Sequence, residues 1–203
     1  MKLYSSAFAP NPRRVRIYLA EKGIAIETVT IDLAKLEHLS PTFTALNPFQ
    51  RVPLLELDDG TLISESIAIC RYFEELHPEP PLFGTGALER ATVEMWQRRL
   101  ELNLMLHVAQ AFRHAHPQMA AMEQPQIAEL AQSSKPKAVE SMRVIDAALA
   151  DRPFIAGGHF SVADITGLVA LDFTKVARIQ IPDELVYLRR WHSALAARPS
   201  AKA

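Results

Sequence analysis

The stretch Ser64-Glu65-Ser66 places a carboxylate between two hydroxyls, where a predicted strand gives way to a predicted helix. The first backbone N–H groups of a helix are unpaired and bind anions, and a serine hydroxyl adds a donor. A neighbouring carboxylate can hold an ammonium group. Glu65 and Ser66 could therefore bind both charged groups of an α-amino acid, although a plain helix cap is the simpler use of this pair.

The dipeptide Val52-Pro53 begins a predicted strand, where a proline costs no hydrogen bond of the sheet. If this bond were cis, the backbone N–H and C=O of Val52 would turn outward and could pair with an extended peptide ligand. Only about 5–6% of X-Pro bonds are cis, so the local sequence by itself favours an ordinary trans strand start.

A polar stripe follows the helix predicted from Leu88 to about His116. Its members recur at spacings of four, four, three and four: Arg99, Asn103, His107, Gln110 and His114. A solvated helix face is the ordinary explanation of such a stripe. If its C-terminal part lines a cleft instead, His107 or His114 could accept a proton, directly or through a water.

The composition is that of a soluble globular protein: 203 residues, 49% hydrophobic, with a formal net charge of -1. The near-neutral charge disfavours nucleic-acid binding, and no apolar run reaches the ~18 residues that a membrane span needs. The one cysteine, Cys70, excludes an internal disulfide and fits a reducing compartment, so we expect a cytoplasmic protein. Cys70 itself is expected in the core, and no residue spacing predicts a metal site.

Residues 1–80 alternate strand and helix patterns in the order β-α-β-α-β-β-α, which predicts an α+β domain. Asn11-Pro12 predicts a helix start with Asn11 as N-cap, and Gly23 predicts its end. The other predicted elements are strands at 2–5 and 27–31, a helix at 41–46, a hairpin at 53–63 and a helix at 66–76.

Three prolines between His77 and Pro81 end that pattern, so we predict a linker at 81–87 and an all-helical domain at 88–203. Pro125 and Pro136 are expected to interrupt the chain before a helix over 139–149. The run Ser161-Val162-Ala163-Asp164 has the form of a capping box and opens an apolar helix that we expect at the centre of this domain. A last helix is predicted over 183–197.

Segments along the whole chain resemble the cytosolic glutathione S-transferases in order and spacing. The matching segments are Lys2-Leu3-Tyr4, Arg14–Ile17, Ala20–Ile24, Asn47-Pro48, Val52–Leu55, Glu65–Ile69, Phe154–Gly157, Phe160–Ile165 and Arg198-Pro199. The resemblance implies a thioredoxin-like N-terminal domain, an all-α helical-bundle C-terminal domain, and a detoxifying homodimer with glutathione as co-substrate.

The resemblance also assigns roles to individual residues. It implies that Pro53 is cis and that the backbone of Val52 pairs with the cysteinyl unit of glutathione. It gives Glu65 and Ser66 the γ-glutamyl head, in agreement with their chemistry. His38, Gln50 and Arg51 lie where the family often contacts the glycyl carboxylate.

The chain departs from the family at the residue that activates the glutathione thiol. Most members have Tyr, Ser or Cys just after the first strand, whereas Ala9 occupies that place here. Ser6 comes several residues early and is kept as a candidate. Asn11 and the backbone N–H groups of Arg13 and Arg14 could stabilise a thiolate at the helix N-terminus.

A helix terminus supplies only ~0.3–1 kcal/mol when exposed, and one pKa unit corresponds to ~1.4 kcal/mol. A second contributor is therefore expected. Some atypical fungal and bacterial members that also lack the usual Tyr, Ser or Cys resemble this chain, which favours His107 or His114, acting through a water.

The predicted function is transfer of glutathione to an apolar electrophile held near Phe8, Met105 and Phe112. A glutathione-dependent isomerase, dehalogenase or peroxidase on the same fold is an alternative, although the Ser-Ser-Cys-Ser motif of the isomerases is missing. A non-catalytic glutathione-binding module is another. A disulfide reductase is disfavoured because no cysteine lies near the first helix.

Overall fold

The computed structural model describes residues 1–203, which form two compact units. The N-terminal unit comprises Met1–Leu82 and Pro199–Ala203, and the helical unit comprises Phe83–Arg198. The sequence-based division assigned all of 88–203 to the second domain, so the structure places Pro199–Ala203 differently. This segment is the short helix η4 (Pro199–Lys202), and it packs on the N-terminal unit because Arg13 Nη2 donates to the Ala201 carbonyl at 3.0 Å.

The N-terminal unit contains a mixed sheet of strand order β2-β1-β3-β4. The strands are β1 (Lys2–Ser5), β2 (Glu27–Thr30), β3 (Leu54–Glu56) and β4 (Leu62–Ser64). β1 is parallel to β2 and antiparallel to β3, which forms an antiparallel hairpin with β4. The predicted order of strands and helices and the thioredoxin-like fold are confirmed.

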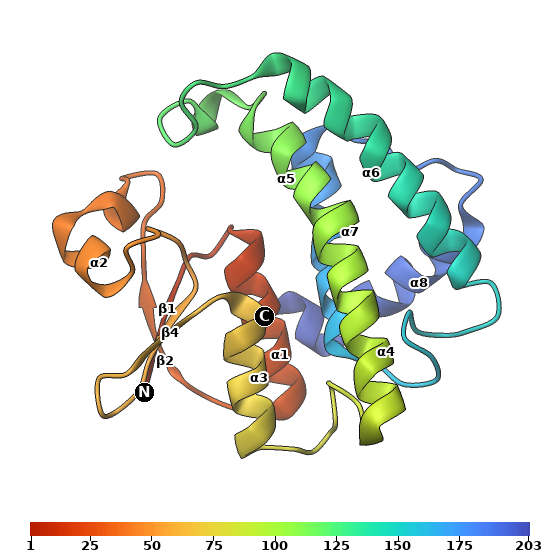
Figure 1. Cartoon of the computed structure of the whole chain (residues 1–203), viewed down its shortest axis with the longest axis horizontal. Helices are drawn as coiled ribbons and strands as arrows, with labels where there is room; N and C mark the ends of the chain where they lie inside the picture. The colour runs from red at the N-terminus through yellow and green to blue at the C-terminus, as the bar shows by residue number, and fades with distance from the viewer. The chain divides into compact units, whose positions relative to one another are not determined.

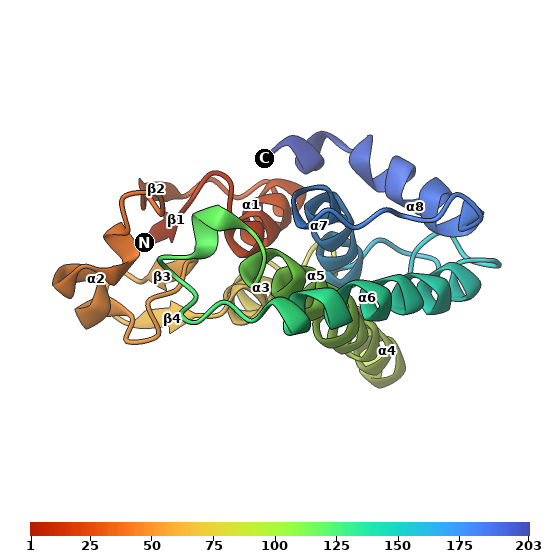
Figure 2. The same ribbon diagram turned by 90° about the horizontal axis from the view of Figure 1, so that it is seen from above.

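The helices of this unit lie on both sides of the sheet: α1 (Pro10–Lys22) and α3 (Ser66–Leu76) on one side, α2 (Pro41–Leu46) on the other (Figures 1 and 2). A single turn, η1 (Glu37–Leu39), precedes α2. Tyr4 and Leu54 pack with Phe43 of α2. Since successive side chains of a strand point to opposite faces, their neighbours Leu3 and Leu55 are buried towards α1 and α3.

The helical unit begins with one long helix, formed by α4 (Gly86–Arg99), the π-helical segment η2 (Leu100–Met105) and α5 (Leu106–Arg113) (Figure 1). Apolar residues recur every four positions along this helix, and they are buried at Trp96, Leu100, Leu104 and Val108. The other helices are the short turn η3 (Pro117–Met119), α6 (Ala128–Ala148), α7 (Val162–Ala177) and α8 (Val186–Ala196).

Pro136 lies inside α6, so the prediction that it interrupts the chain before a helix is wrong. Proline removes the N–H that would bond to the carbonyl of Gln132. Both residues are exposed on the outer side of the helix, where water can satisfy that carbonyl. The helix therefore continues through the proline.

Helix α7 is the centre of the helical unit, as the sequence predicts. It is buried along nearly its whole length and packs against α4, η2, α5 and α8. The predicted capping box is present, with Ser161 and Asp164 bonding to each other's backbone or side chain. No helix in the structure combines the length and the apolar character that crossing a bilayer requires.

Gly167→Ala is expected to destabilise the protein by about 1–3 kcal/mol, because overpacking forces neighbouring side chains from their rotamers. A Cβ atom at Gly167 would lie 2.2 Å from Cη2 of Trp191, whose ring is fully buried. Thermal unfolding should show a fall of about 2–4 °C in Tm per kcal/mol. Gly158→Ala is the matched control, since nothing lies within 4 Å of the added methyl group there. Equal Tm values for the two variants would contradict this packing argument.

Candidate functional site

The strand register of the N-terminal unit brings the predicted glutathione-site residues to one edge of its sheet. Leu54 pairs with Ser64 and with Tyr4, so Pro53 lies opposite Glu65 on one side and opposite Ser5 on the other. The β1–α1 loop, the start of β3 and the start of α3 therefore meet at this edge. Ala9, at the end of that loop, packs against the apolar cluster that contains Val52 and Leu54.

The Val52-Pro53 bond is cis in the structure. This is the form that the family resemblance implies, and it differs from the trans form that the local sequence favours. The side chain of Val52 is anchored in the core between Ile31, Phe43 and Leu54. The dipeptide is thus held by apolar packing directly before β3.

Glu65 is the N-cap of α3, but its side chain makes no capping hydrogen bond. Its backbone lies at φ 68 and ψ 118, a left-handed conformation that costs a non-glycine residue roughly 1–3 kcal/mol. Such strain is concentrated at functional sites, where the surrounding structure maintains it. The simpler interpretation, a plain capping role for Glu65, has no support in this geometry. Ser66 follows as the first helical residue and is buried.

The three candidates for the glycyl carboxylate lie on the connection that leads into Val52. His38 is buried in η1 and offers little surface, with 3% of it exposed. Gln50 has a left-handed backbone, and its side-chain amide donates to the Thr44 hydroxyl at 2.9 Å. Arg51 is exposed, and its carbonyl accepts a hydrogen bond from the side chain of Asn47.

The start of α1 differs from the prediction in a way that matters for thiol activation. The helix begins at Pro10, with Ala9 as N-cap, so Asn11 is not the capping residue. Pro10 and Pro12 have no N–H, and the N–H of Arg13 already donates to the Ala9 carbonyl at 3.3 Å. The N–H of Arg13, which we predicted as an anion donor together with that of Arg14, is therefore already engaged in the first turn of the helix. Within the helix's first three residues, Asn11 alone has a backbone N–H.

The side chains around this helix start are also constrained. The amide oxygen of Asn11 accepts from Arg14 Nη2 at 2.8 Å, which leaves its NH2 group as a donor. Ser6 is buried in the β1–α1 loop. Tyr4 donates its hydroxyl to Glu56 at 2.6 Å, and this hydrogen bond raises the pKa of Tyr4 to about 12. The Tyr4 hydroxyl therefore stays protonated at neutral pH, and its proton is already donated to Glu56 instead of to a thiolate.

The polar stripe of the long helix divides into two parts. Arg99 and Asn103 are exposed, as a solvated face requires. Further along, Gln110 accepts from the Ser134 hydroxyl of α6 at 3.0 Å and lies 3.3 Å from Nδ1 of His107. His114 is held more firmly, since its Nδ1 accepts from the N–H of Ile127 at 3.2 Å and its Nε2 lies 3.7 Å from Glu123. Both ring nitrogens of His114 are thus engaged within the helical unit.

The residues predicted for the electrophile differ in exposure. Phe8 is 98% exposed, whereas Met105 is buried at 5% and offers almost no surface to a ligand. Phe112 is half-buried and packs edge-to-face on Phe173, with ring centroids 5.0 Å apart. Cys70 is fully buried, and this burial raises the pKa of its thiol, which confirms its predicted role in packing.

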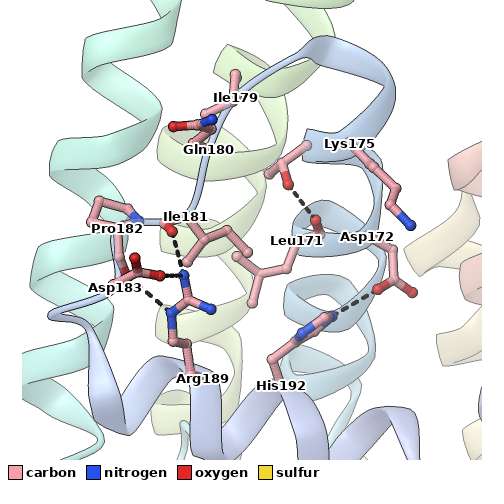
Figure 3. Close-up of a pocket in the computed structure, with 11 residues that line it drawn as sticks. Leu171, Asp172, Lys175, Ile179, Gln180, Ile181, Pro182, Asp183, Arg189 and His192 are labelled. Carbon is pink, nitrogen blue, oxygen red and sulfur yellow. Dashed lines mark hydrogen bonds and ion pairs between the residues drawn. The ribbon is translucent and has the colours of Figure 1, made fainter.

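A separate cavity of about 810 Å³ lies in the helical unit, between the end of α7, residues 179–183 and the start of α8 (Figure 3). Four of its polar side chains form two pairs, Asp172 with His192 and Asp183 with Arg189. His192 Nε2 lies 2.7 Å from Asp172 Oδ1, and Arg189 Nη2 donates to Asp183 at 2.5 Å and to the Ile181 carbonyl at 2.6 Å. None of the predicted site residues lines this cavity.

Comparisons with known proteins cover both units. Family models described as the N-terminal and C-terminal domains of glutathione S-transferase match residues 8–76 and 105–199. Glutathione S-transferase 2 of Saccharomyces cerevisiae is 40% identical over 205 residues, which span 100% of this chain and 88% of the relative.

Two solved structures are equally similar. The crystal structure of Gtt2 from Saccharomyces cerevisiae matches with a TM-score of 0.95 and 40% identity, covering 100% of this chain and 99% of that one. A glutathione S-transferase domain-containing protein of Marinobacter aquaeolei matches with a TM-score of 0.95 and 39% identity, over 98% of this chain and 99% of that one. With these matches over its whole length, the chain belongs to the glutathione S-transferase family.

Proposed function

We propose that this protein is a glutathione transferase, which binds glutathione, lowers the pKa of its thiol and adds the thiolate to an apolar electrophile. One observation carries the proposal. The strand register places cis-Pro53 opposite Glu65, whose carboxylate makes no capping bond, at the edge where the β1–α1 loop begins.

In this proposal each part of glutathione has its own partner. The ammonium group pairs with Glu65, and the γ-glutamyl carboxylate accepts hydrogen bonds from Ser66 and the start of α3. The cysteinyl backbone pairs with the N–H and C=O of Val52 through main-chain hydrogen bonds of the kind that join neighbouring strands. The glycyl carboxylate is assigned to Gln50 and Arg51, with His38 in a smaller role because it is buried.

The thiolate needs stabilisation from more than the helix start. The first turn of α1 offers the backbone N–H and side-chain NH2 of Asn11, and a helix terminus is worth only ~0.3–1 kcal/mol when exposed. We propose His107 as the second contributor, acting through a water, because its contact with Gln110 leaves Nε2 available. Ser6 and His114 remain weaker candidates, since Ser6 is buried and both nitrogens of His114 are engaged.

The remaining features of the proposal follow the family. We infer a cytoplasmic homodimer that detoxifies apolar electrophiles, with two domains that correspond to the two compact units. Phe8 and Phe112 are the proposed contacts of the electrophile. Met105 contributes only through the packing of its own helix, because its side chain is buried.

Ultraviolet titration of bound glutathione tests this function directly. A transferase should hold the thiol at a pKa well below that of free glutathione, so thiolate absorbance should appear at lower pH in the complex. A bound thiol with the pKa of free glutathione would overturn the transferase assignment and would favour a non-catalytic glutathione-binding module.

Steady-state kinetics and glutathione affinity of variants then identify the groups that activate the thiol. Asn11→Ala and His107→Ala should lower kcat for a conjugation reaction more than they weaken glutathione binding. His114→Ala should lower kcat less than His107→Ala, because the His114 ring already contacts Ile127 and Glu123 within the helical unit. Wild-type turnover in all three variants would exclude these groups as activators.

A further inference from the structure

Arg16 reaches back from the middle of α1 and donates three hydrogen bonds, one to the end of β1 and two to the start of the β1–α1 loop. Its Nη1 donates to the Ser5 hydroxyl at 3.2 Å and to the Ser6 carbonyl at 3.0 Å, and its Nη2 donates to the Ala7 carbonyl at 2.9 Å. One side chain therefore holds the last residue of β1 and the first two residues of the loop that leads to the proposed thiol site.

Arginine is suited to this task for a geometric reason. The guanidinium group is planar and presents its donors in a fixed fork, so it can hold several acceptors at once in a defined orientation. A lysine ammonium is a single point at the end of a flexible chain and cannot span three successive acceptors. Arg16 is half-buried, so these bonds replace much of the water around its charge.

The loop needs such a brace because α1 starts with few donors. Within the first three helical residues, Asn11 alone has a backbone N–H, and no side chain caps the helix. The direction of that N–H depends on the path of the chain through Ser6, Ala7 and Ala9. A small rotation of the loop would therefore turn the only available backbone donor of this turn away from a thiolate.

We propose that Arg16 is a positioning residue for thiol activation. By holding the carbonyls of Ser6 and Ala7, it orients the start of α1 towards the glutathione sulfur. The inference rests on the proposed function, since it requires glutathione at this edge of the sheet. The positive charge of Arg16 acts in the same direction as the helix terminus, because both favour the thiolate over the thiol.

The test compares Arg16→Lys and Arg16→Met with the wild-type protein by ultraviolet titration of bound glutathione, glutathione affinity and steady-state kinetics. The lysine variant keeps the charge and loses the fork. It should raise the thiol pKa and, at a pH below the wild-type thiol pKa, lower kcat by about tenfold for each unit of that rise, while Kd for glutathione changes little. The methionine variant, which also loses the charge, should show a larger shift.

Two further variants separate this role from a general effect on folding. Arg98→Lys makes the same chemical change in α4, where the guanidinium pairs only with Glu94 and Glu101, and should leave the thiol pKa unchanged. Ser5→Ala removes one acceptor and leaves Arg16 in place, so it tests the brace even if an Arg16 variant fails to fold. We expect a smaller rise in thiol pKa from Ser5→Ala than from Arg16→Lys.

An unchanged thiol pKa in folded Arg16→Lys would overturn the positioning role, and so would lowered stability as its sole effect. If Arg16→Lys does not fold, an unchanged thiol pKa in Ser5→Ala is the contrary result. These outcomes differ from failure of the proposed function, in which the wild-type complex itself would show the thiol pKa of free glutathione.

Discussion

Asp164→Ala is expected to lower the free energy of unfolding by about 3–5 kcal/mol, because it leaves several buried donors without a partner. The carboxylate is fully buried and accepts four hydrogen bonds, all between 2.8 and 2.9 Å. The donors are the N–H of Ile155, the N–H and hydroxyl of Ser161, and Nε1 of Trp191. Asp164 therefore joins the start of α7 to α8 and to the turn at 154–157.

The electrostatics of Asp164 add to this expectation. Burial raises the pKa of its carboxyl, while the hydrogen bonds from Ile155, Ser161 and Trp191 act in the opposite direction. Asp164→Asn keeps the volume but presents an NH2 group to donors, so it should cost an intermediate amount. Both variants can be measured by urea unfolding followed by circular dichroism.

Asp151→Ala is the matched control for this measurement. Asp151 is exposed and pairs with Arg152 at 3.2 Å, and surface ion pairs of this kind contribute about 0–1 kcal/mol. A loss below 1 kcal/mol in Asp164→Ala would show that water or a rearranged backbone satisfies the four donors. The capping box would then be a minor contribution to the stability of the helical unit.

The role of Asp164 illustrates what a sequence can predict. A capping box needs residues three positions apart, so Ser161-Val162-Ala163-Asp164 already predicts the start of α7. The hairpin over 53–63 was likewise predicted correctly, because its turn and strands depend on residues close together in the chain. The bond from Trp191 to Asp164 joins residues far apart in the chain, and no local pattern predicts it.

Local signals were wrong where the chain's surroundings decide the outcome. Asn11-Pro12 resembles a helix start, yet Pro10 is equally acceptable in a first turn and the helix begins there. Pro136 resembles a helix break, but its face of α6 is exposed and the lost hydrogen bond can be replaced by water. In both cases proline lacks an N–H, as the prediction assumed. What decides the outcome is where the proline lies relative to the helix start and to solvent.

The sequence predicted which residues belong to the candidate site but not how their segments are arranged in space. Val52-Pro53 and Glu65-Ser66 are distinctive in sequence, and their hairpin places them side by side. The meeting with the β1–α1 loop depends on the pairing of β1 with β3, which joins distant segments. The three bonds of Arg16 and the left-handed backbone of Glu65 carry no sequence signal of their own.

Glu65→Gly is expected to stabilise the protein and to weaken glutathione binding. A non-glycine residue at φ 68 carries roughly 1–3 kcal/mol of strain, and glycine would relieve it at an entropic cost of about 0.5–1 kcal/mol. We therefore expect a net gain of about 1 kcal/mol in the free energy of unfolding. The same change removes the carboxylate proposed for the ammonium group, so glutathione affinity should fall by on the order of 1–3 kcal/mol.

Glu65→Gln separates these two effects, because it keeps the strained backbone and the side-chain length while removing the charge. It should lose affinity for glutathione to a similar extent without gaining stability, as calorimetry and urea unfolding would show. Ser66→Ala should weaken binding by a comparable amount through the lost hydroxyl donor. If Glu65→Gly gains stability but binds glutathione as the wild type does, then the strain at this position does not serve the γ-glutamyl head. A residue that is held in place for its ligand should have these two effects. Its strained backbone destabilises the free protein, and its carboxylate stabilises the complex.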